Sequence, residues 1–209
     1  MKETKKTKNN VIVVSGPSGV GKSTICKEVV KRMKDVYLSI SVTTRDRAEG
    51  EVNGVDYRYV SPQQFQELVN KGHLLEHAEV FGNLYGTPKD KVEQALAAGE
   101  TILLQIDVQG ARQIKEIYKD AVLIFILAPS HKELAERMKL RGREDDERAQ
   151  QRLDEADDEI AAAWQYYEHM VINDDLESAI KEVMQIIEAA RNRKKDRQKG
   201  LNINTGEKG

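Results

Sequence analysis

Cysteine is almost absent from this sequence, and so are the apolar runs that mark secreted and membrane proteins. Cys26 is the single cysteine among 209 residues, so the chain cannot form an internal disulfide and nothing indicates an oxidising compartment. The first ten residues are basic, but the apolar run behind them covers only residues 11–14, far too few for a signal peptide or a membrane span. We therefore expect a cytoplasmic protein with no membrane contact.

An excess of charge of one sign is also lacking. Lys and Arg number 33 while Asp and Glu number 35, which gives a formal net charge of -2. This balance gives no electrostatic reason to expect a nucleic acid as a partner. The histidines show no metal-ligand spacing apart from the pair His73 and His77, which lies where a strand is expected, so a zinc site is not favoured.

The most informative stretch is residues 15–24, which read S-G-P-S-G-V-G-K-S-T after the apolar run at 11–14. It fits the pattern G-x-x-x-x-G-K-[ST] in the expected context, behind a strand and before a helix. Its glycines let the backbone approach an anion closely, and the helix that opens at Lys22 adds its positive dipole end. Lys22 would reach the β- and γ-phosphates of ATP or another triphosphate, and the Ser23 hydroxyl would bind Mg²⁺. The residues expected to contact the triphosphate are Gly16, Pro17, Ser18, Gly19, Val20, Gly21, Lys22, Ser23 and Thr24.

Strands and helices alternate along the rest of the chain. The expected strands are residues 11–14, 37–44, 74–81, 101–108, 121–127 and 171–172, with residues 82–88 as a loop. Asn53 and Gly54 favour a tight hairpin turn before a short strand near Tyr57. Cys26 falls on the helix behind the glycine-rich loop, where we expect it to act as a small buried hydrophobe.

This alternation predicts an α/β fold: a P-loop NTPase-type parallel sheet flanked by helices. The length suits a single domain, which we place at residues 11–190. It is preceded by a flexible N-terminus at residues 1–10. It is followed by a basic tail at residues 191–209, which we expect to be a frayed helix end and disordered.

One reading of the phosphate-binding loop is a GTPase, because Asp107 and Gly110 fit D-x-x-G. No N-K-x-D sequence follows to read guanine, and a whole inserted αβ unit separates the loop from Asp107. A kinase of a small acceptor explains more, since it needs a second site and basic groups that neutralise the transferred phosphoryl group. The candidates for these two roles are Arg45 and Tyr57 in the insertion, and Arg137, Arg141 and Arg152 on charged helices.

In its motifs the chain resembles a guanylate kinase over about residues 11–190. The similar stretches are V-V-S-G-P-S-G at 13–19, S-I-S-V-T-T-R at 39–45, G-E-V-N-G-V-D-Y at 50–57, G-N-L-Y-G-T at 82–87, I-D-V-Q-G at 106–110 and I-N-D-D at 172–175. The resemblance implies a GMP-binding insertion at about residues 42–90 and a lid at about residues 137–160 that closes over ATP. It also implies transfer of a phosphoryl group from ATP to GMP, and to dGMP, with Mg²⁺. We expect a monomer or a homodimer.

The same resemblance implies roles for individual residues. The residues that would read guanine are Ser41, Glu76, Thr87 and Asp107. Those that would hold the GMP phosphate are Arg45, Tyr57 and Tyr85. Those that would act on the triphosphate and the transferred phosphoryl group are Lys22, Arg137, Arg141 and Arg152. Asn173 would touch adenine.

The chain departs from the family pattern at two places. The family has a second arginine three residues after Arg45, whereas this chain has Ala48 there and Arg47 one residue earlier. The family also has an acid where this chain has Gln105, which can hydrogen-bond a metal-bound water but adds no negative charge. The competing function is a scaffold domain that has lost ATP chemistry, and the intact G-K-S sequence of the loop argues against it.

Overall fold

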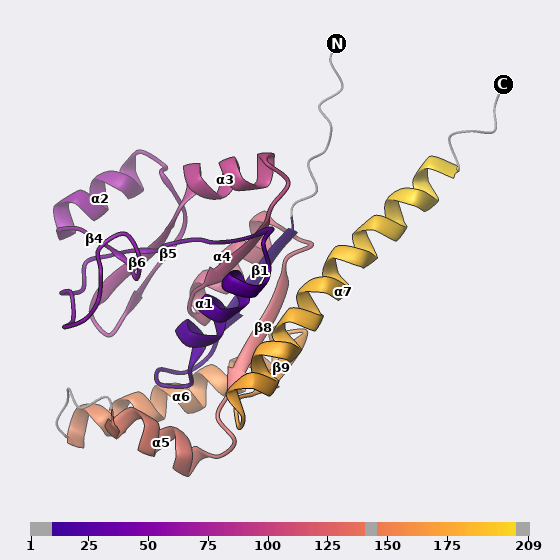
Figure 1. Ribbon diagram of the computed structural model, residues 1–209. Coiled ribbons are helices and arrows are strands. Elements are labelled where there is room, and N and C mark those ends of the chain that lie inside the picture. The colour runs from indigo at the N-terminus through magenta and orange to yellow at the C-terminus, as the bar shows by residue number, and fades with distance from the viewer. Residues whose placement is uncertain (1–9, 141–145, 204–209) are drawn as a thin grey trace.

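The computed structural model describes residues 10–140 and 146–203, which form two sheets and seven helices (Figure 1). The helices are α1 (Lys22–Arg32), α2 (Pro62–Asn70), α3 (Lys89–Ala97), α4 (Val108–Ile117), α5 (His131–Leu140), α6 (Asp146–Tyr166) and α7 (Leu176–Ile203). The strands of the larger sheet are β1 (Asn10–Ser15), β2 (Val36–Leu38), β7 (Thr101–Gln105), β8 (Val122–Leu127) and β9 (His169–Ile172). The strands of the smaller sheet are β3 (Val42–Thr43), β4 (Arg58–Tyr59), β5 (Leu74–Val80) and β6 (Asn83–Pro88).

β1 lies in the middle of the larger sheet, whose strand order is β2-β7-β1-β8-β9. Every neighbouring pair is parallel, and Val13 of β1 lies opposite Leu104 on one side and Leu123 on the other. This confirms the predicted parallel sheet. Parallel strands end at one edge, so the loop after β1 and Asp107 after β7 lie at the same edge, where ligands of such sheets bind.

Helices cover both faces of this sheet. Ile12 and Val14 pack in one apolar cluster with residues of α1 and α7, whereas Val11 and Val13 pack in a second cluster with residues of α3 and α4. Alternate side chains of β1 therefore enter different cores, which is why the strand is apolar throughout. Cys26 of α1 is fully buried and its burial raises the pKa of the thiol to about 12, which confirms its expected role as a small buried hydrophobe.

The smaller sheet arises from residues inserted between α1 and α3, and it corrects two expectations. The predicted loop at residues 82–88 is wrong, because β6 pairs antiparallel with β5 and β3, with Tyr85 opposite Ala78 and Thr43. Pairing on both edges outweighs the turn preference of the glycine and asparagine residues in that stretch. The predicted single strand at residues 37–44 is two strands, one in each sheet.

The predicted hairpin at Asn53 and Gly54 is also wrong, since β4 pairs with β3 in parallel. Gly54 instead turns a compact loop at φ +80, and its N–H donates to the Tyr57 carbonyl at 2.8 Å. The Asp56 carboxylate accepts a hydrogen bond from the N–H of Val52, also at 2.8 Å. This loop fixes the backbone immediately before Tyr57.

Helix α7 continues to Ile203, well past residue 190, where the sequence predicted the end of the folded part (Figure 1). Arg191 ties this helix to the larger sheet, because it donates to Thr101 Oγ1 at 2.8 Å and to the Asp35 carbonyl at 2.7 Å. Residues 1–9 and 204–209, which include most of the predicted N-terminal segment, lie outside the described residues. Among those described, no helix has the length and apolar character that a membrane span requires.

Candidate functional site

The loop between β1 and α1 has the backbone shape that its glycines predict. Gly16 has φ +144, and a Cβ atom there would lie 2.4 Å from the Ile126 carbonyl oxygen. Gly21 has φ +100 as the N-cap of α1, and a Cβ atom there would lie 2.5 Å from Asn173 Nδ2. Any side chain at either position would therefore be both strained and obstructed, so the loop depends on glycine to curl around an anion.

Two side chains of this loop hold the positions that phosphate chemistry needs. Lys22 Nζ donates to the Gly16 carbonyl and, at 2.8 Å, to that of Pro17, which keeps its charge at the centre of the loop. Ser23 Oγ accepts a hydrogen bond of 2.9 Å from Gln105 Nε2 at the end of β7. Gln105 therefore lies within hydrogen-bonding distance of the residue that is predicted to bind Mg²⁺.

The described residues contain no group of three His, Cys, Asp or Glu side chains that could hold a metal ion. A divalent cation at Ser23 would thus keep waters and take its other ligands from phosphate oxygens. Mg²⁺ prefers this kind of binding over an all-protein cage. The donor set at Ser23 and Gln105 fits a cation that arrives with a nucleotide.

A buried carboxylate lies at the other end of the site. Glu76 of β5 is only 3% exposed, and its Oε1 accepts a hydrogen bond of 2.5 Å from Thr87 Oγ1. Burial raises the pKa of Glu76 to about 7; the Thr87 hydroxyl opposes this shift and the charge of Asp107 adds to it. A Cβ atom on Gly110 would lie 2.4 Å from Glu76 Oε2 and 3.2 Å from Asp107 Oδ1, so both carboxylates lie close to this glycine.

The other residues predicted to read guanine have distinct positions. Asp107 caps α4, because its carboxylate accepts from the N–H of Gly110 at 3.0 Å and of Gln109 at 3.3 Å. Ser41 is buried at 8% exposure and lines the same cavity as Glu76 and Asp107. Thr87 is 1% exposed, and it holds Glu76 from behind.

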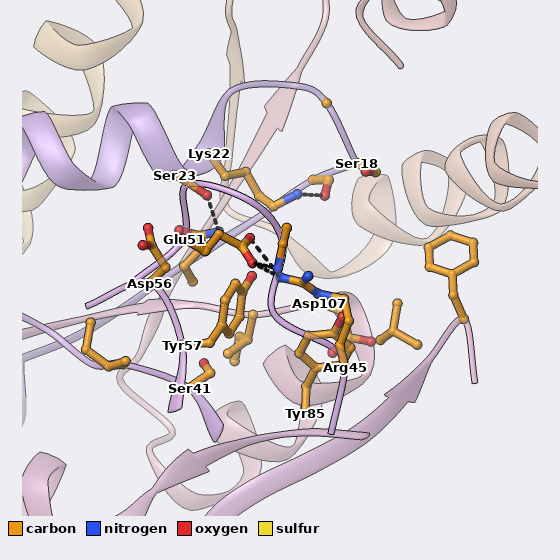
Figure 2. A pocket seen from close by; sticks show the side chains of 18 of the residues that line it. Ser18, Lys22, Ser23, Ser41, Arg45, Glu51, Asp56, Tyr57, Tyr85 and Asp107 are labelled. Atoms are coloured by element: carbon orange, nitrogen blue, oxygen red, sulfur yellow. Dashed lines mark hydrogen bonds and ion pairs between the residues drawn. The ribbon is translucent and has the colours of Figure 1, made fainter. Parts of the chain in front are cut away.

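The predicted phosphate-binding group gathers in the inserted region. The rings of Tyr57 and Tyr85 meet edge to face with centroids 5.9 Å apart. The Arg45 guanidinium lies over the Tyr57 ring, 5.4 Å from its centroid. Arg45 also pairs with Glu51 at 2.8 Å, a partner that the sequence did not predict. Figure 2 shows these side chains pointing into one cavity.

A single open cleft of about 1290 Å³ joins these parts. It is larger than the roughly 300–1,000 Å³ of a typical small-molecule pocket, as a site for two nucleotides would be. Its walls include Lys22 and Ser23 at the phosphate-binding loop, Arg45 and Tyr57 in the insertion, and Glu76. The cleft therefore brings the two predicted ends of the site together.

The predicted lid residues are placed only in part. Arg137 donates to the Asn173 carbonyl at 2.9 Å and to Glu133 Oε1 at 2.5 Å. Arg141 lies outside the described residues, and Arg152 lies on α6 with a side chain that is not described. Asn173 is 6% exposed and donates to the Val20 carbonyl at 2.8 Å, so it supports the phosphate-binding loop from behind. The roles of these residues toward ATP stay predictions.

The cleft is also lined by charged groups that were not predicted, and three of them are informative. Glu159 of α6 is one; burial raises its pKa to about 7, Lys22 opposes this shift, and Asp107 adds to it. Lys27 of α1 and Asp56 form an ion pair of 2.6 Å between the core and the insertion. The charged composition of α6 is typical of a solvated helix, so only the packing of that helix could reveal Glu159.

Comparisons with known proteins agree on one family. The family model for guanylate kinase matches residues 8–190. The guanylate kinase of Carboxydothermus hydrogenoformans is 44% identical over 87% of this chain and 89% of that protein, and that of Thermus thermophilus is 45% identical over 89% and 84%. The crystal structure of guanylate kinase from Anaplasma phagocytophilum matches with a TM-score of 0.74 and 34% identity, over 88% of this chain and 87% of that one. The chain belongs to the guanylate kinase family.

Proposed function

We propose that this chain transfers the terminal phosphoryl group of ATP to GMP, giving ADP and GDP. The observation that carries the proposal is a single cleft with a phosphate-binding loop at one end and the buried Glu76 at the other. Family membership supports the same reaction. The transfer needs little covalent chemistry from the protein, because positioning two nucleotides in line and stabilising charge supply most of the catalysis.

The ATP end would use the backbone N–H groups of the loop and the Lys22 ammonium. In the structure Lys22 contacts loop carbonyls, and phosphate oxygens would replace these weaker acceptors. Arg137, Arg141 and Arg152 are proposed to add positive charge around the transferred group when the lid closes, with Asn173 near adenine. Closure would also exclude water, which otherwise competes with GMP for the phosphoryl group.

Ser23 would hold Mg²⁺, with Gln105 placed to hydrogen-bond a metal-bound water. Bound in this way, the cation would neutralise charge on the phosphate oxygens during transfer. This proposal is supported by the contact between Gln105 and the Ser23 hydroxyl. A cytoplasmic location and a monomeric or dimeric state stay predictions.

The GMP end would read the base with Glu76 and hold the phosphate with Arg45, Tyr57 and Tyr85. Guanine presents two donors on one edge, N1–H and the 2-amino group, and an ionised carboxylate offers two matching acceptors. Adenine has an acceptor at N1 and no 2-amino group, so it would leave Glu76 facing a lone pair. Sites built around such hydrogen bonds can reject a wrong ligand by roughly 10⁴-fold.

The direct test is ADP formation from ATP with GMP, dGMP, AMP, CMP and UMP in turn. GMP should be the preferred acceptor over AMP, CMP and UMP, and Lys22→Ala should abolish turnover while calorimetry shows GMP affinity within a few fold of the original. A Lys22→Ala variant as active as the unmodified protein would overturn the assignment of the phosphate-binding loop. Turnover with another monophosphate in preference to GMP would overturn the proposed substrate.

A further inference from the structure

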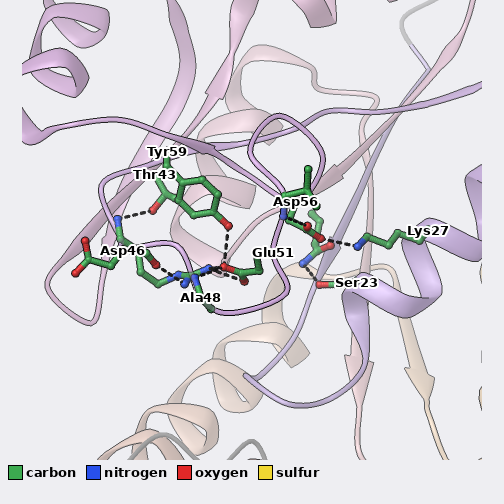
Figure 3. A network of polar contacts seen from close by, with 11 residues as sticks. Ser23, Lys27, Thr43, Asp46, Ala48, Glu51, Asp56 and Tyr59 are labelled. Atoms are coloured by element: carbon green, nitrogen blue, oxygen red, sulfur yellow. Dashed lines mark hydrogen bonds and ion pairs between the residues drawn. The ribbon is translucent and has the colours of Figure 1, made fainter.

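A network of polar contacts that includes Glu51, Tyr59 and Ala48 (Figure 3) holds Arg45 in one orientation. Its Nη2 donates to both carboxylate oxygens of Glu51, at 2.8 and 2.9 Å, and its Nη1 donates to the Asp46 carbonyl at 2.7 Å. The rings of Tyr57 and Tyr59 lie 5.4 and 5.8 Å from the guanidinium carbon. Hydrogen bonds at the edge of the guanidinium and aromatic rings against its faces therefore hold this long side chain in one of its many rotamers.

Glu51 is itself fixed by groups other than Arg45. Its Oε2 accepts hydrogen bonds from the Tyr59 hydroxyl at 2.7 Å and from the N–H of Ala48 at 2.8 Å. Burial alone would raise the pKa of Glu51, but Arg45, Tyr59 and Ala48 together hold it below the ordinary value, so the carboxylate stays ionised. The contacts from Tyr59 and Ala48 therefore hold the Glu51 carboxylate in position independently of Arg45.

The Glu51 carboxylate beside Arg45 would either hinder or favour the binding of the GMP phosphate. If Glu51 merely occupied the place of the phosphate, it would compete with GMP and would have to leave. The bonds from Tyr59 and Ala48 argue against this, because they keep Glu51 in place independently of Arg45. The Nε–H of Arg45 is not engaged in the contacts to Glu51 and Asp46, so the guanidinium keeps a donor for a second anion.

We propose that Glu51 is a positioning residue for GMP, which orients the Arg45 guanidinium before the phosphate arrives. The inference rests on the proposed function, in which Arg45 binds the phosphate of GMP. Pre-organisation of this kind lowers the ordering cost of binding, so it acts on GMP affinity more than on the transfer step. Tyr59 contributes through Glu51, since its hydroxyl contacts the carboxylate.

Glu51→Gln is the sharpest test, because it keeps the volume of the side chain and places an amide NH₂ against the donors of Arg45 and Ala48. The KM for GMP should rise at least about tenfold, while kcat falls less than about threefold and the KM for ATP stays within about twofold. Glu67→Gln is the matched control: it removes the same charge from an exposed position on α2 that does not line the cleft, and it should leave the kinetics unchanged. Tyr59→Phe should raise the KM for GMP by a smaller factor and serves in place of Glu51→Gln if that variant does not fold.

A double-mutant cycle with Arg45→Ala separates the inference from the proposed function. In the Arg45→Ala background, Glu51→Gln should change the KM for GMP by less than about twofold, because its effect acts through Arg45. If Arg45→Ala alone leaves the KM for GMP unaltered, the proposed phosphate site is wrong. If Arg45→Ala raises that KM but Glu51→Gln leaves it unaltered or lowers it, the positioning role is wrong. An equal effect of Glu51→Gln in both backgrounds would likewise overturn it.

Discussion

At the scale of single residues, Glu76 should make stability depend on pH. Its pKa is raised from 4.5 to about 7 in the folded protein, so between these values the native state binds more protons than the unfolded state. Stability of the ligand-free protein should therefore fall as pH rises through this window, by an amount on the order of 3 kcal/mol for this group. Thermal melts of the ligand-free protein from pH 5 to pH 8 measure this slope.

Glu76→Gln should flatten the slope without abolishing it, because the raised pKa of Glu159 acts in the same direction. Glu67→Gln is a suitable control, since Glu67 is an exposed acid of α2. An unchanged slope in Glu76→Gln would show that Glu76 is ionised in the folded protein throughout this range.

Gln105 offers a second test at this scale. An acid at its position beside Ser23 would add negative charge near a cation bound to the triphosphate. Gln105→Asp should therefore lower the Mg²⁺ concentration needed for the half-maximal rate. Gln105→Glu is the longer-chain comparison. A Mg²⁺ titration that neither substitution changes would place the cation away from Gln105.

At the scale of elements, the start of α4 is shaped to receive Glu76. Gly110 is helical, and alanine would favour the helix by about 1 kcal/mol, yet its Cβ would lie 2.4 Å from Glu76 Oε2. The carboxylate is the end of a flexible side chain, so it would move away. Gly110→Ala should lower kcat/KM for GMP at least about tenfold, and its gain in helix propensity should be offset by the displacement of a buried, hydrogen-bonded carboxylate.

Glu116→Ala on the same helix is the control for Gly110→Ala, because Glu116 is exposed. It should leave GMP kinetics unaltered. Equal GMP kinetics for Gly110→Ala and the unmodified protein would mean that the position of the Glu76 carboxylate does not limit recognition.

The far end of α7 should matter little to the rest of the protein. Figure 1 shows it extending away from the sheets, and Arg191 is bonded to Thr101 and Asp35. Deletion of residues 192–209 should therefore leave activity and melting temperature nearly unchanged. Arg191→Ala, by contrast, should lower the melting temperature by roughly 2–4 °C, since it removes hydrogen bonds worth about 1 kcal/mol. Loss of activity in the deletion variant would show that this segment docks or assembles the protein.

The elements that the sequence predicted best are those whose signals are local. The apolar run at residues 11–14 and the glycine-rich loop act within a few residues, and each appears where expected. β6 was missed because its stability comes from β3 and β5, which flank it in space. The partners of Arg45 and Glu76 could not be deduced either, since hydrogen bonding between side chains depends on how the inserted sheet packs.

At the scale of the whole molecule, one cleft connects the proposed ATP site with the proposed GMP site. The parallel sheet presents the phosphate-binding loop, and the inserted sheet presents Glu76 and Arg45. The Lys27–Asp56 ion pair links the two parts at 2.6 Å, although such an exposed pair contributes little energy. Specificity for guanine and transfer from ATP should therefore respond to different substitutions.

The central claim is that Glu76 selects GMP as the acceptor, and steady-state kinetics of Glu76→Gln with GMP and AMP test it most directly. The amide keeps one acceptor but turns an NH₂ toward a guanine donor, so kcat/KM for GMP should fall at least about a hundredfold while the KM for ATP hardly changes. Glu67→Gln should behave like the unmodified protein. A GMP-to-AMP preference that Glu76→Gln leaves unaltered would contradict the claim, and Asp107 would then be the principal reader of guanine.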